Sequence, residues 1–432
     1  MLFEPRRQRD CDLDPWRPLT LVFVSDWDPD RGFLEGGSTF SSMPGIFKLL
    51  LGYEKAGHRV HYVYGSQDLR RSSSYTSGRV TVHNVRLRPR LRGRLLLRKL
   101  LPVKHIWRWT MFCWLLNSFR RCHPDTVCAL KFTHLYEAFL VARLTKVPLI
   151  YREYGVLNAY SAVFEKRSLV NIYRVLPILL PLFIPAEEVI ITNDGTRADE
   201  LMRKLRPRFR RLHYWVNGVD KEMLTHSYDS VACRRHFGLP SDSFVLLTLS
   251  RLEGNKRVDR ALRLLAAILT RHPEAHLAIA GEGEQKTALV ELTSSLGITK
   301  HVTFLGSVNH SEIGPLLSAA GIFLALSDFS NVGNTLLEAL AAGMCIVTLA
   351  AGATVEFVEN GKNGVLLRPS ELHRLPDVIC WLIENPEERL RLQRGAAEYA
   401  DRNLESWSAR IQREINLVEQ ACGIEPSGTI LF

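Results

Sequence analysis

The sequence of 432 residues lacks the run of about 20 apolar residues that a membrane-spanning helix requires. Its most apolar stretch, residues 169–184, is interrupted by Asn171, Arg174 and two prolines. The first residues, MLFEPRRQRDCDLDPWRP, are polar and contain no apolar core, so we expect no secretory signal. The eight cysteines include no CxxC pair and no spacing typical of a zinc site. We therefore expect buried free thiols, no metal and a cytoplasmic protein.

Acidic residues are missing from residues 69–124, which contain fourteen Lys and Arg residues. Outside this window 42 basic residues stand against 45 acidic ones, so the whole net charge of +11 originates here. Within residues 86–121 the arginines alternate with Trp and Leu, and Pro102 is expected to separate two helices. This mixture favours peripheral binding to an anionic membrane surface. A helix that packs its tryptophans inward and a site for a partner protein stay open as alternatives, and we expect no nucleic-acid partner.

Apolar strands alternate with amphipathic helices along the chain, which predicts βαβ units and parallel sheets. The pattern occurs twice and predicts an α/β protein of two doubly wound domains. We assign residues 1–220 to an N-terminal domain, 221–400 to a C-terminal domain and 401–432 to a helix that packs back toward the N-terminal domain. The segment 214–240 is predicted to be the linker. The strands are expected at residues 19–26, 60–64, 80–87, 126–130, 148–152, 188–192, 244–249, 275–280, 302–305, 322–326 and 345–348.

The glycine fingerprint GxGxxG of dinucleotide-binding domains is missing where it would be expected. Ligands of open α/β sheets bind beyond the carboxyl ends of the strands, so the loops that follow strands are the candidate sites. Gly36 and Gly37 precede a predicted helix, where backbone N–H groups can approach an anion, although a plain turn is an equal alternative. Gly281 and Glu282 lie in a tight turn from a strand to a helix.

The loop after residues 244–249 contains Arg251 and Lys256. An arginine can bind phosphate oxygens with two hydrogen bonds, and a lysine adds a compact charge. Solvated surface charge is the alternative interpretation.

The segment 327–343, SDFSNVGNTLLEALAAG, has the strongest local pattern. Asn334 and Glu338 are four positions apart, so they lie on one face of a predicted helix. Gly333 begins this helix and leaves its first N–H groups free for a phosphate, while Glu338 can accept two hydrogen bonds from a ribose diol. An ordinary buried helix with a polar cap would explain the leucines but not the shared face.

With these motifs in this order, the chain resembles the retaining glycosyltransferases of family GT4, which have the GT-B fold of two Rossmann-like domains facing a cleft. The likeness is strongest over residues 244–369. It implies that Arg251 and Lys256 hold the diphosphate of a nucleotide-sugar donor, and that Glu338 binds its ribose. It also implies that the loop 306–309 reads the base. Further donor contacts are implied for Gly36, Gly37, Gly281, Glu282, Asn331, Val332, Gly333, Asn334 and Thr335.

The resemblance implies transfer of a sugar with retention, from a UDP- or GDP-type donor to a polysaccharide or lipid-linked acceptor. It implies no cofactor and no metal, so the DxD-like Asp26-Trp27-Asp28 is taken as incidental. The acceptor would be reached at the cytosolic face of a membrane.

The sequence departs from the family pattern at two positions. Ser330 stands where the family has an acidic residue eight positions before Glu338, and Asp328 is a possible substitute that alternation would turn to the other face. Tyr154 stands where the family often has a histidine, so Arg152, Glu153 and His134 are candidates for the acceptor site. A nucleotide-sugar epimerase and a non-catalytic sugar-nucleotide-binding or scaffold protein stay open as other functions.

Overall fold

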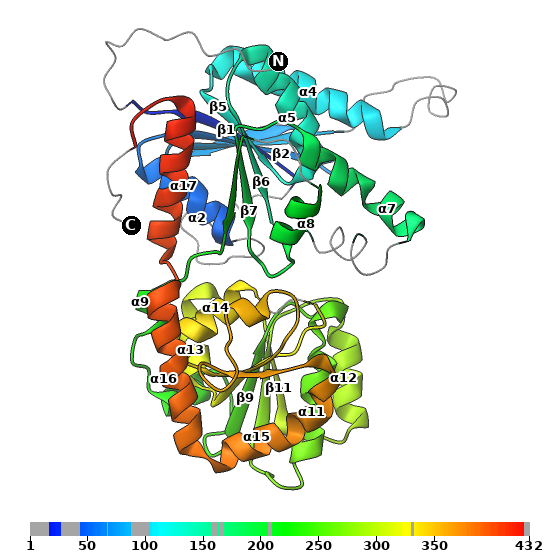
Figure 1. Ribbon diagram of the computed structural model, residues 1–432, viewed down its shortest axis with the longest axis vertical. Coiled ribbons are helices and arrows are strands. Elements are labelled where there is room, and N and C mark those ends of the chain that lie inside the picture. The colour runs from blue at the N-terminus through cyan, green and yellow to red at the C-terminus, as the bar shows by residue number, and fades with distance from the viewer. Residues whose placement is uncertain are drawn as a thin grey trace.

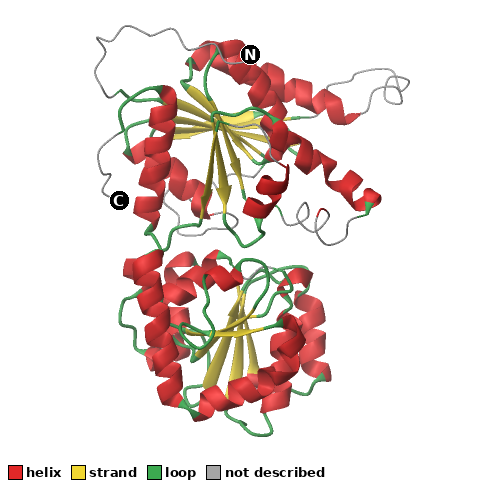
Figure 2. Cartoon of the chain, in the orientation of Figure 1, coloured by secondary structure: helices red, strands yellow, loops and turns green. Residues whose placement is uncertain are grey.

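The computed structural model of the chain describes residues 17–26, 44–66, 68–87, 103–154, 156, 163, 168–205, 210–329 and 332–426. Two lobes follow one another along the chain, one above the other in Figure 1. In each lobe helices lie on both faces of a central sheet (Figure 2). The prediction of two doubly wound α/β domains is therefore confirmed.

The N-terminal lobe contains an eight-stranded sheet with the order β3-β4-β2-β1-β5-β6-β7-β8. Neighbouring strands pair in parallel except β3 and β4, which are antiparallel. The sequence analysis missed β3 and β8, because an exposed edge strand needs no apolar run. The strands are β1 (Thr20–Ser25), β2 (Arg59–Ser66), β3 (Ser73–Ser77), β4 (Val80–Arg86), β5 (Thr126–Leu130), β6 (Leu149–Glu153), β7 (Glu188–Thr192) and β8 (Arg211–Trp215).

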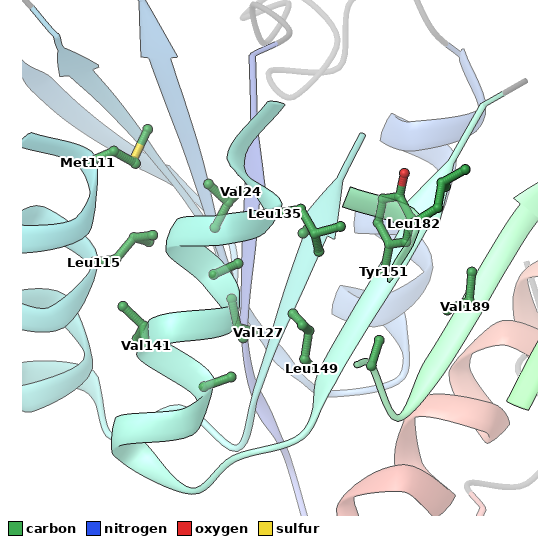
Figure 3. Close-up of a cluster of buried hydrophobic side chains, with 14 of the residues drawn as sticks. Val24, Met111, Leu115, Val127, Leu135, Val141, Leu149, Tyr151, Leu182 and Val189 are labelled. Carbon is green, nitrogen blue, oxygen red and sulfur yellow. The ribbon is translucent and has the colours of Figure 1, made fainter. Parts of the chain in front are cut away.

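Two apolar clusters cover the two faces of this sheet. One joins strand residues such as Val24 and Val127 to Met111 and Leu115 of α4 and to Val141 of α5, as Figure 3 shows. The other packs α2 and α17 against the opposite face. The helices of this lobe are α2 (Pro44–Lys55), α4 (Val103–Cys122), α5 (Leu135–Thr145), α7 (Leu169–Leu179) and α8 (Ala198–Leu205), and the C-terminal α17 (Trp407–Cys422) joins them.

The C-terminal lobe contains six parallel strands in the order β11-β10-β9-β12-β13-β14. The strand order reverses between β9 and β12, so the loops after these strands diverge and leave room for a ligand. The strands are β9 (Phe244–Leu249), β10 (Ala275–Ala280), β11 (Val302–Gly306), β12 (Ile322–Ala325), β13 (Cys345–Leu349) and β14 (Val365–Leu367). The helices are α9 (Lys221–Leu224), α10 (Ser230–His236), α11 (Val258–Ile268), α12 (Lys286–Ser295), α13 (Ile313–Ser318), α14 (Asn334–Ala341), α15 (Leu375–Glu384) and α16 (Pro386–Asn403).

The predicted linker 214–240 is not a simple loop, because it contains the end of β8 and both α9 and α10. The chain crosses between the lobes twice, after β8 and between α16 and α17 (Figure 1). The two crossings are hydrogen-bonded to each other. The N–H of Val219 donates to the carbonyl oxygen of Glu405 at 3.0 Å, and the N–H of Trp407 donates to that of Val219 at 3.2 Å.

A buried group of three charges fastens α17 to the N-terminal lobe. Arg152 of β6 and Arg410 of α17 both donate to the carboxylate of Glu414, and the three side chains are at most 4% exposed. Burial favours the neutral form of Glu414, but the two guanidinium groups outweigh it and lower the pKa of this carboxyl. Arg152 is therefore bound to the helix and is not available for the acceptor site that the sequence analysis assigned to it.

We predict that Arg152→Met lowers the free energy of unfolding by about 3–5 kcal/mol, since it leaves a buried charge without one of its partners. The pKa of Glu414 is lowered in the folded state, so its contribution is complete above the ordinary carboxyl pKa and is lost as the pH falls through the lowered one. Urea unfolding at pH 7, followed by tryptophan fluorescence, measures the loss.

The control is Arg402→Met, which removes an equivalent pair with Glu398 on the exposed surface of α16. Its cost should stay within about 0.5 kcal/mol. Equal costs for the two variants would contradict the anchoring role of Arg152.

Candidate functional site

Two of the predicted basic residues lie in the loop after β9, beside a pocket of about 530 Å³. The side chain of Arg251 is 74% exposed and forms an ion pair with Glu253. Lys256 ends the short 3-10 helix Gly254–Lys256 and is half-buried. The pocket brings this loop together with the loop after β10, and its walls are formed by Arg251, Glu253, Gly254, Asn255, Glu282, Gly283 and Glu284.

The glycine-containing turn after β10 supports the first loop through its backbone. Leu252 donates its N–H to the carbonyl oxygen of Glu282 at 2.9 Å. Gly281 has a φ of +131°, and a Cβ atom there would lie 1.9 Å from the carbonyl oxygen of Ser250. The close packing of the turn after β10 against the loop after β9 therefore requires a glycine at position 281. This requirement is independent of the donor contact predicted for Gly281. The side chain of Glu282 is exposed and pairs with Lys286 at 2.7 Å.

Charged groups of the N-terminal lobe face this loop. Burial lowers the pKa of Lys256, and the charge of Arg251 lowers it further, while Glu253 and the N-lobe residue Asp194 raise it. Burial also lowers the pKa of Lys131, which directly follows β5. The charge of Arg251, in the C-terminal lobe, lowers the pKa of Lys131 further. The ends of strands from both sheets thus meet at one cleft, as the edge rule for parallel sheets predicts.

Helix α14 presents the predicted ribose carboxylate at this same edge. Glu338 is only 4% exposed, and its Oε2 atom has no hydrogen-bond partner. Burial raises the pKa of Glu338 to about 7, although His310 and Lys48 act to lower it. Asn334, the first residue of the helix, accepts a hydrogen bond from the side chain of Asn217 at 2.8 Å.

The structure describes some of the remaining residues predicted to contact the donor, and others lie outside the described residues. Gly333 is the N-cap of α14, and Thr335 lies in its first turn and is half-buried. Val332 is 2% exposed and packs into the apolar core of the lobe. The predictions for Gly36, Gly37 and Asn331, and the departure at Ser330, lie outside the described residues. Asp328 forms ion pairs with Arg257 at 3.1 Å and Arg260 at 2.5 Å, which supports its expected orientation away from the donor.

The sequence analysis missed a line of charged residues behind Glu338. The Oδ2 atom of Asp220 lies 2.5 Å from Nζ of Lys48 and 2.5 Å from Nε2 of His310. The other ring nitrogen of His310 lies 3.9 Å from Oε1 of Glu338. Lys48, Asp220 and His310 come from segments far apart in the chain, so the sequence could not show that they meet. The one signal was the position of His310, shortly after the strand β11.

The acceptor candidates of the N-terminal lobe separate into a cleft group and a core residue. Burial raises the pKa of Glu153, at the end of β6, to about 7. Its carboxylate accepts hydrogen bonds from the hydroxyl of Tyr151 at 2.5 Å and from the N–H of Tyr154 at 3.0 Å. Asp26, which the sequence analysis took as incidental, lies near this group: it accepts a hydrogen bond from Thr133 at 2.9 Å and lies 3.9 Å from Lys131. His134 is 1% exposed, and burial lowers its pKa to about 4, which favours a structural histidine.

The described residues offer neither a metal site nor a membrane span. They contain no cluster of three or more His, Cys, Asp or Glu residues able to hold a metal ion. Among the same residues, no helix combines the length and the apolar composition that crossing a bilayer requires.

Comparison with known proteins relates the chain to glycosyltransferases. Residues 232–399 match the family model described as "Glycosyl transferases group 1". The chain is 26% identical to a glycogen synthase of Mycobacterium tuberculosis over 66% of each chain. The first curated relatives are matched over 49% to 66% of their own length.

The solved structures establish the fold. A sucrose-phosphate synthase from Thermosynechococcus elongatus superposes with a TM-score of 0.73 at 15% identity, over 93% of this chain and 98% of that one. Anabaena HepE in complex with UDP-glucose superposes with a TM-score of 0.68 at 19% identity, over 93% and 100%. The predicted GT-B fold is confirmed, and the matches together support a glycosyltransferase.

We predict that Gly281→Ala lowers the free energy of unfolding by about 1–3 kcal/mol, because the new Cβ meets a carbonyl oxygen and the backbone keeps a positive φ. Gly254→Ala in the neighbouring loop is the matched control, since a Cβ there meets nothing within 4 Å. Thermal unfolding of both variants compares them. A Gly281→Ala protein as stable as the control would show that the two loops are not packed as described.

Proposed function

We propose that the protein is a glycosyltransferase that moves a sugar, with retention of anomeric configuration, from a UDP- or GDP-type nucleotide sugar to a polysaccharide or lipid-linked acceptor. The observation that carries the proposal is the buried Glu338 carboxylate, which has one unpaired oxygen. A buried acceptor without a partner is costly, and the two hydroxyls of a ribose would supply the missing donors. The family match and the likeness to Anabaena HepE with UDP-glucose support a nucleotide-sugar donor.

The cleft provides the groups that a departing diphosphate needs. Arg251 and Lys256 carry positive charge at the edge of the sheet, and the N-terminus of α14, which has no side-chain cap, adds the positive end of a helix dipole. These groups would stabilise the negative charge that grows on the diphosphate as its bond to the anomeric carbon breaks. The acceptor oxygen would bond to that carbon from the same side, and its proton would pass to the leaving phosphate oxygen. This path keeps the configuration without a protein nucleophile.

The acceptor would lie against the N-terminal lobe. Asp26, Lys131 and Glu153 end or follow neighbouring strands β1, β5 and β6 at the cleft edge of that sheet. Carboxylates and a lysine can bind several sugar hydroxyls at once. The likeness to a glycogen synthase supports a glycan acceptor.

We predict that Glu338→Gln and Lys256→Met abolish stabilisation by nucleotide. A nucleotide at 100 times its Kd should stabilise the wild-type protein by about 2.7 kcal/mol, and a thermal-shift screen with UDP, GDP, ADP and their sugar conjugates detects this. The matched controls are Glu359→Gln and Lys362→Met, which change an exposed surface pair in the same lobe. Both should respond as the wild type does.

Turnover assays with the nucleotide sugars that bind separate the proposal from its rivals. Transfer to an acceptor, with the anomer of the product determined by NMR, supports the proposal. A changed free sugar formed without an acceptor would favour an epimerase. Nucleotide binding without turnover across donors and acceptors would favour a scaffold protein.

We further propose that the N-terminal lobe binds the surface of an anionic membrane. The basic helix α4 packs inward through Met111, Leu115 and Phe119. Of its described tryptophans, Trp114 is partly buried against the same cluster and Trp109 stays 66% exposed. Helices α5 and α7 share the apolar cluster under α4 and expose large apolar residues of their own. The exposed apolar residues of these helices and of the turn Leu180–Phe183 are Trp109, Leu140, Leu144, Leu169, Val170, Tyr173, Leu180 and Phe183.

Basic side chains accompany this apolar surface, among them the exposed Arg120, Arg143 and Arg174. Apolar groups among cations are the chemistry of a peripheral membrane contact. A lipid-linked acceptor would then be presented in the plane where the lobe lies.

We predict that Leu169→Ser with Tyr173→Ser weakens cosedimentation with vesicles containing phosphatidylserine at least threefold, since each exposed apolar group adds to insertion. The control is Val355→Ser with Leu390→Ser, which removes exposed apolar residues from the C-terminal lobe. Wild-type binding should fall as salt is raised. Absence of binding at low salt would contradict the membrane proposal.

A further inference from the structure

A continuous line of charges links the N-terminal lobe to the ribose site. Lys48 of α2 is 16% exposed and lies 2.5 Å from Asp220. Asp220 lies 2.5 Å from His310, which is 13% exposed and lies 3.9 Å from Glu338. Lys48 belongs to the N-terminal lobe, Asp220 directly follows the paired crossing at Val219, and His310 and Glu338 belong to the C-terminal lobe.

The order of signs along this line is alternating, which has an electrostatic consequence for Glu338. A carboxylate flanks the histidine on either side, so a ring protonated at both nitrogens can donate to Asp220 and attract Glu338. Burial would raise the pKa of Asp220, but His310 and Lys48 outweigh it and lower that pKa. Among the described residues, three charged groups act on Glu338: His310 and Lys48 lower its pKa, and Asp220 raises it.

A role in stability alone does not explain why Glu338, the last residue of this line, is buried. Glu338 is buried and gains only the long contact to His310, while its second oxygen has no partner. Burying a charge under these conditions costs stability unless a ligand completes its hydrogen bonds. The line therefore leads to a group that is prepared for a ligand.

We propose that Lys48, Asp220 and His310 are positioning residues for Glu338. Asp220 holds the two cations in place, and Lys48 and His310 keep Glu338 charged and oriented for a ribose diol while the N-terminal lobe is seated. The inference rests on the proposed function, because it takes the ribose of a nucleotide as the ligand of Glu338. Movement of α2 away from the paired crossing at Val219 would separate Lys48 from Asp220 and weaken the binding of nucleotide. Donor binding and closure of the cleft are thereby coupled through named side chains.

The test is the affinity of UDP and GDP, measured by calorimetry between pH 6 and 9, for wild type, Lys48→Met, Lys48→Arg and Lys55→Met. Because the ionised carboxylate accepts both ribose hydroxyls, wild-type affinity should rise with pH through about 7, the value to which burial raises the pKa of Glu338. Lys48→Met removes a positive charge and should move this midpoint upward by about one pH unit, with roughly fivefold weaker binding at pH 7 and little change at pH 9.

The controls separate charge from packing. Lys48 also lies 5.3 Å from the centre of the Trp407 ring, and methionine preserves that packing. Lys48→Arg should restore the wild-type profile, whereas Lys55→Met makes the same charge change at an exposed position of α2 and should leave the profile unmoved. Superimposable profiles for wild type and Lys48→Met would overturn the positioning role alone. A wild-type protein that binds neither nucleotide at any pH would overturn the proposed function and this inference with it.

Discussion

The hydrogen bonds between the two crossings of the chain determine how the lobes can move. A single linker would leave two domains free to reorient, whereas here Val219 uses both its N–H and its carbonyl oxygen on the returning segment between α16 and α17. Beyond that segment, Glu414 of α17 forms an ion pair with Arg152 of β6, in the sheet of the N-terminal lobe. The returning helix is thus held at its first residue, Trp407, and near its middle, at Glu414. Reorientation of the lobes would have to bend the chain at the paired crossings. Asp220 lies one residue beyond the paired crossing at Val219.

The chemistry of the cleft follows from the direction of the strands. Every strand of the C-terminal sheet, and every strand except β3 in the N-terminal sheet, delivers its following loop to the same edge. The C-terminal lobe contributes the two cations suited to a diphosphate, Arg251 and Lys256, and the N-terminal lobe contributes a mixed set that includes Lys131 and Glu153. The C-terminal lobe is therefore suited to a strongly anionic nucleotide sugar. The N-terminal lobe offers a sugar groups that donate hydrogen bonds and groups that accept them.

Sequence patterns predict those parts of such a protein that depend on neighbours along the chain. The buried strands β5, β7, β9 and β10 coincide with the predicted ranges, because each is an apolar run between turns. Glu338 and Asn334 could be paired because four positions make one helical turn. The helices α9 and α10 were missed since short, polar segments carry little periodicity. The face of Arg152 could not be predicted, because its partner Glu414 lies 262 positions away.

The two buried carboxylates of the cleft differ in a way that assigns their roles. Burial raises the pKa of both Glu153 and Glu338 to about 7. The carboxylate of Glu153 already accepts hydrogen bonds from Tyr151 and Tyr154, so its cost of burial is largely met within the fold. One oxygen of Glu338 has no such donor, and its cost is met only when a ligand supplies one. A group left in this state contributes little to folding and much to binding, which is why the proposed ribose site, rather than the acceptor side, should set the affinity of the cleft.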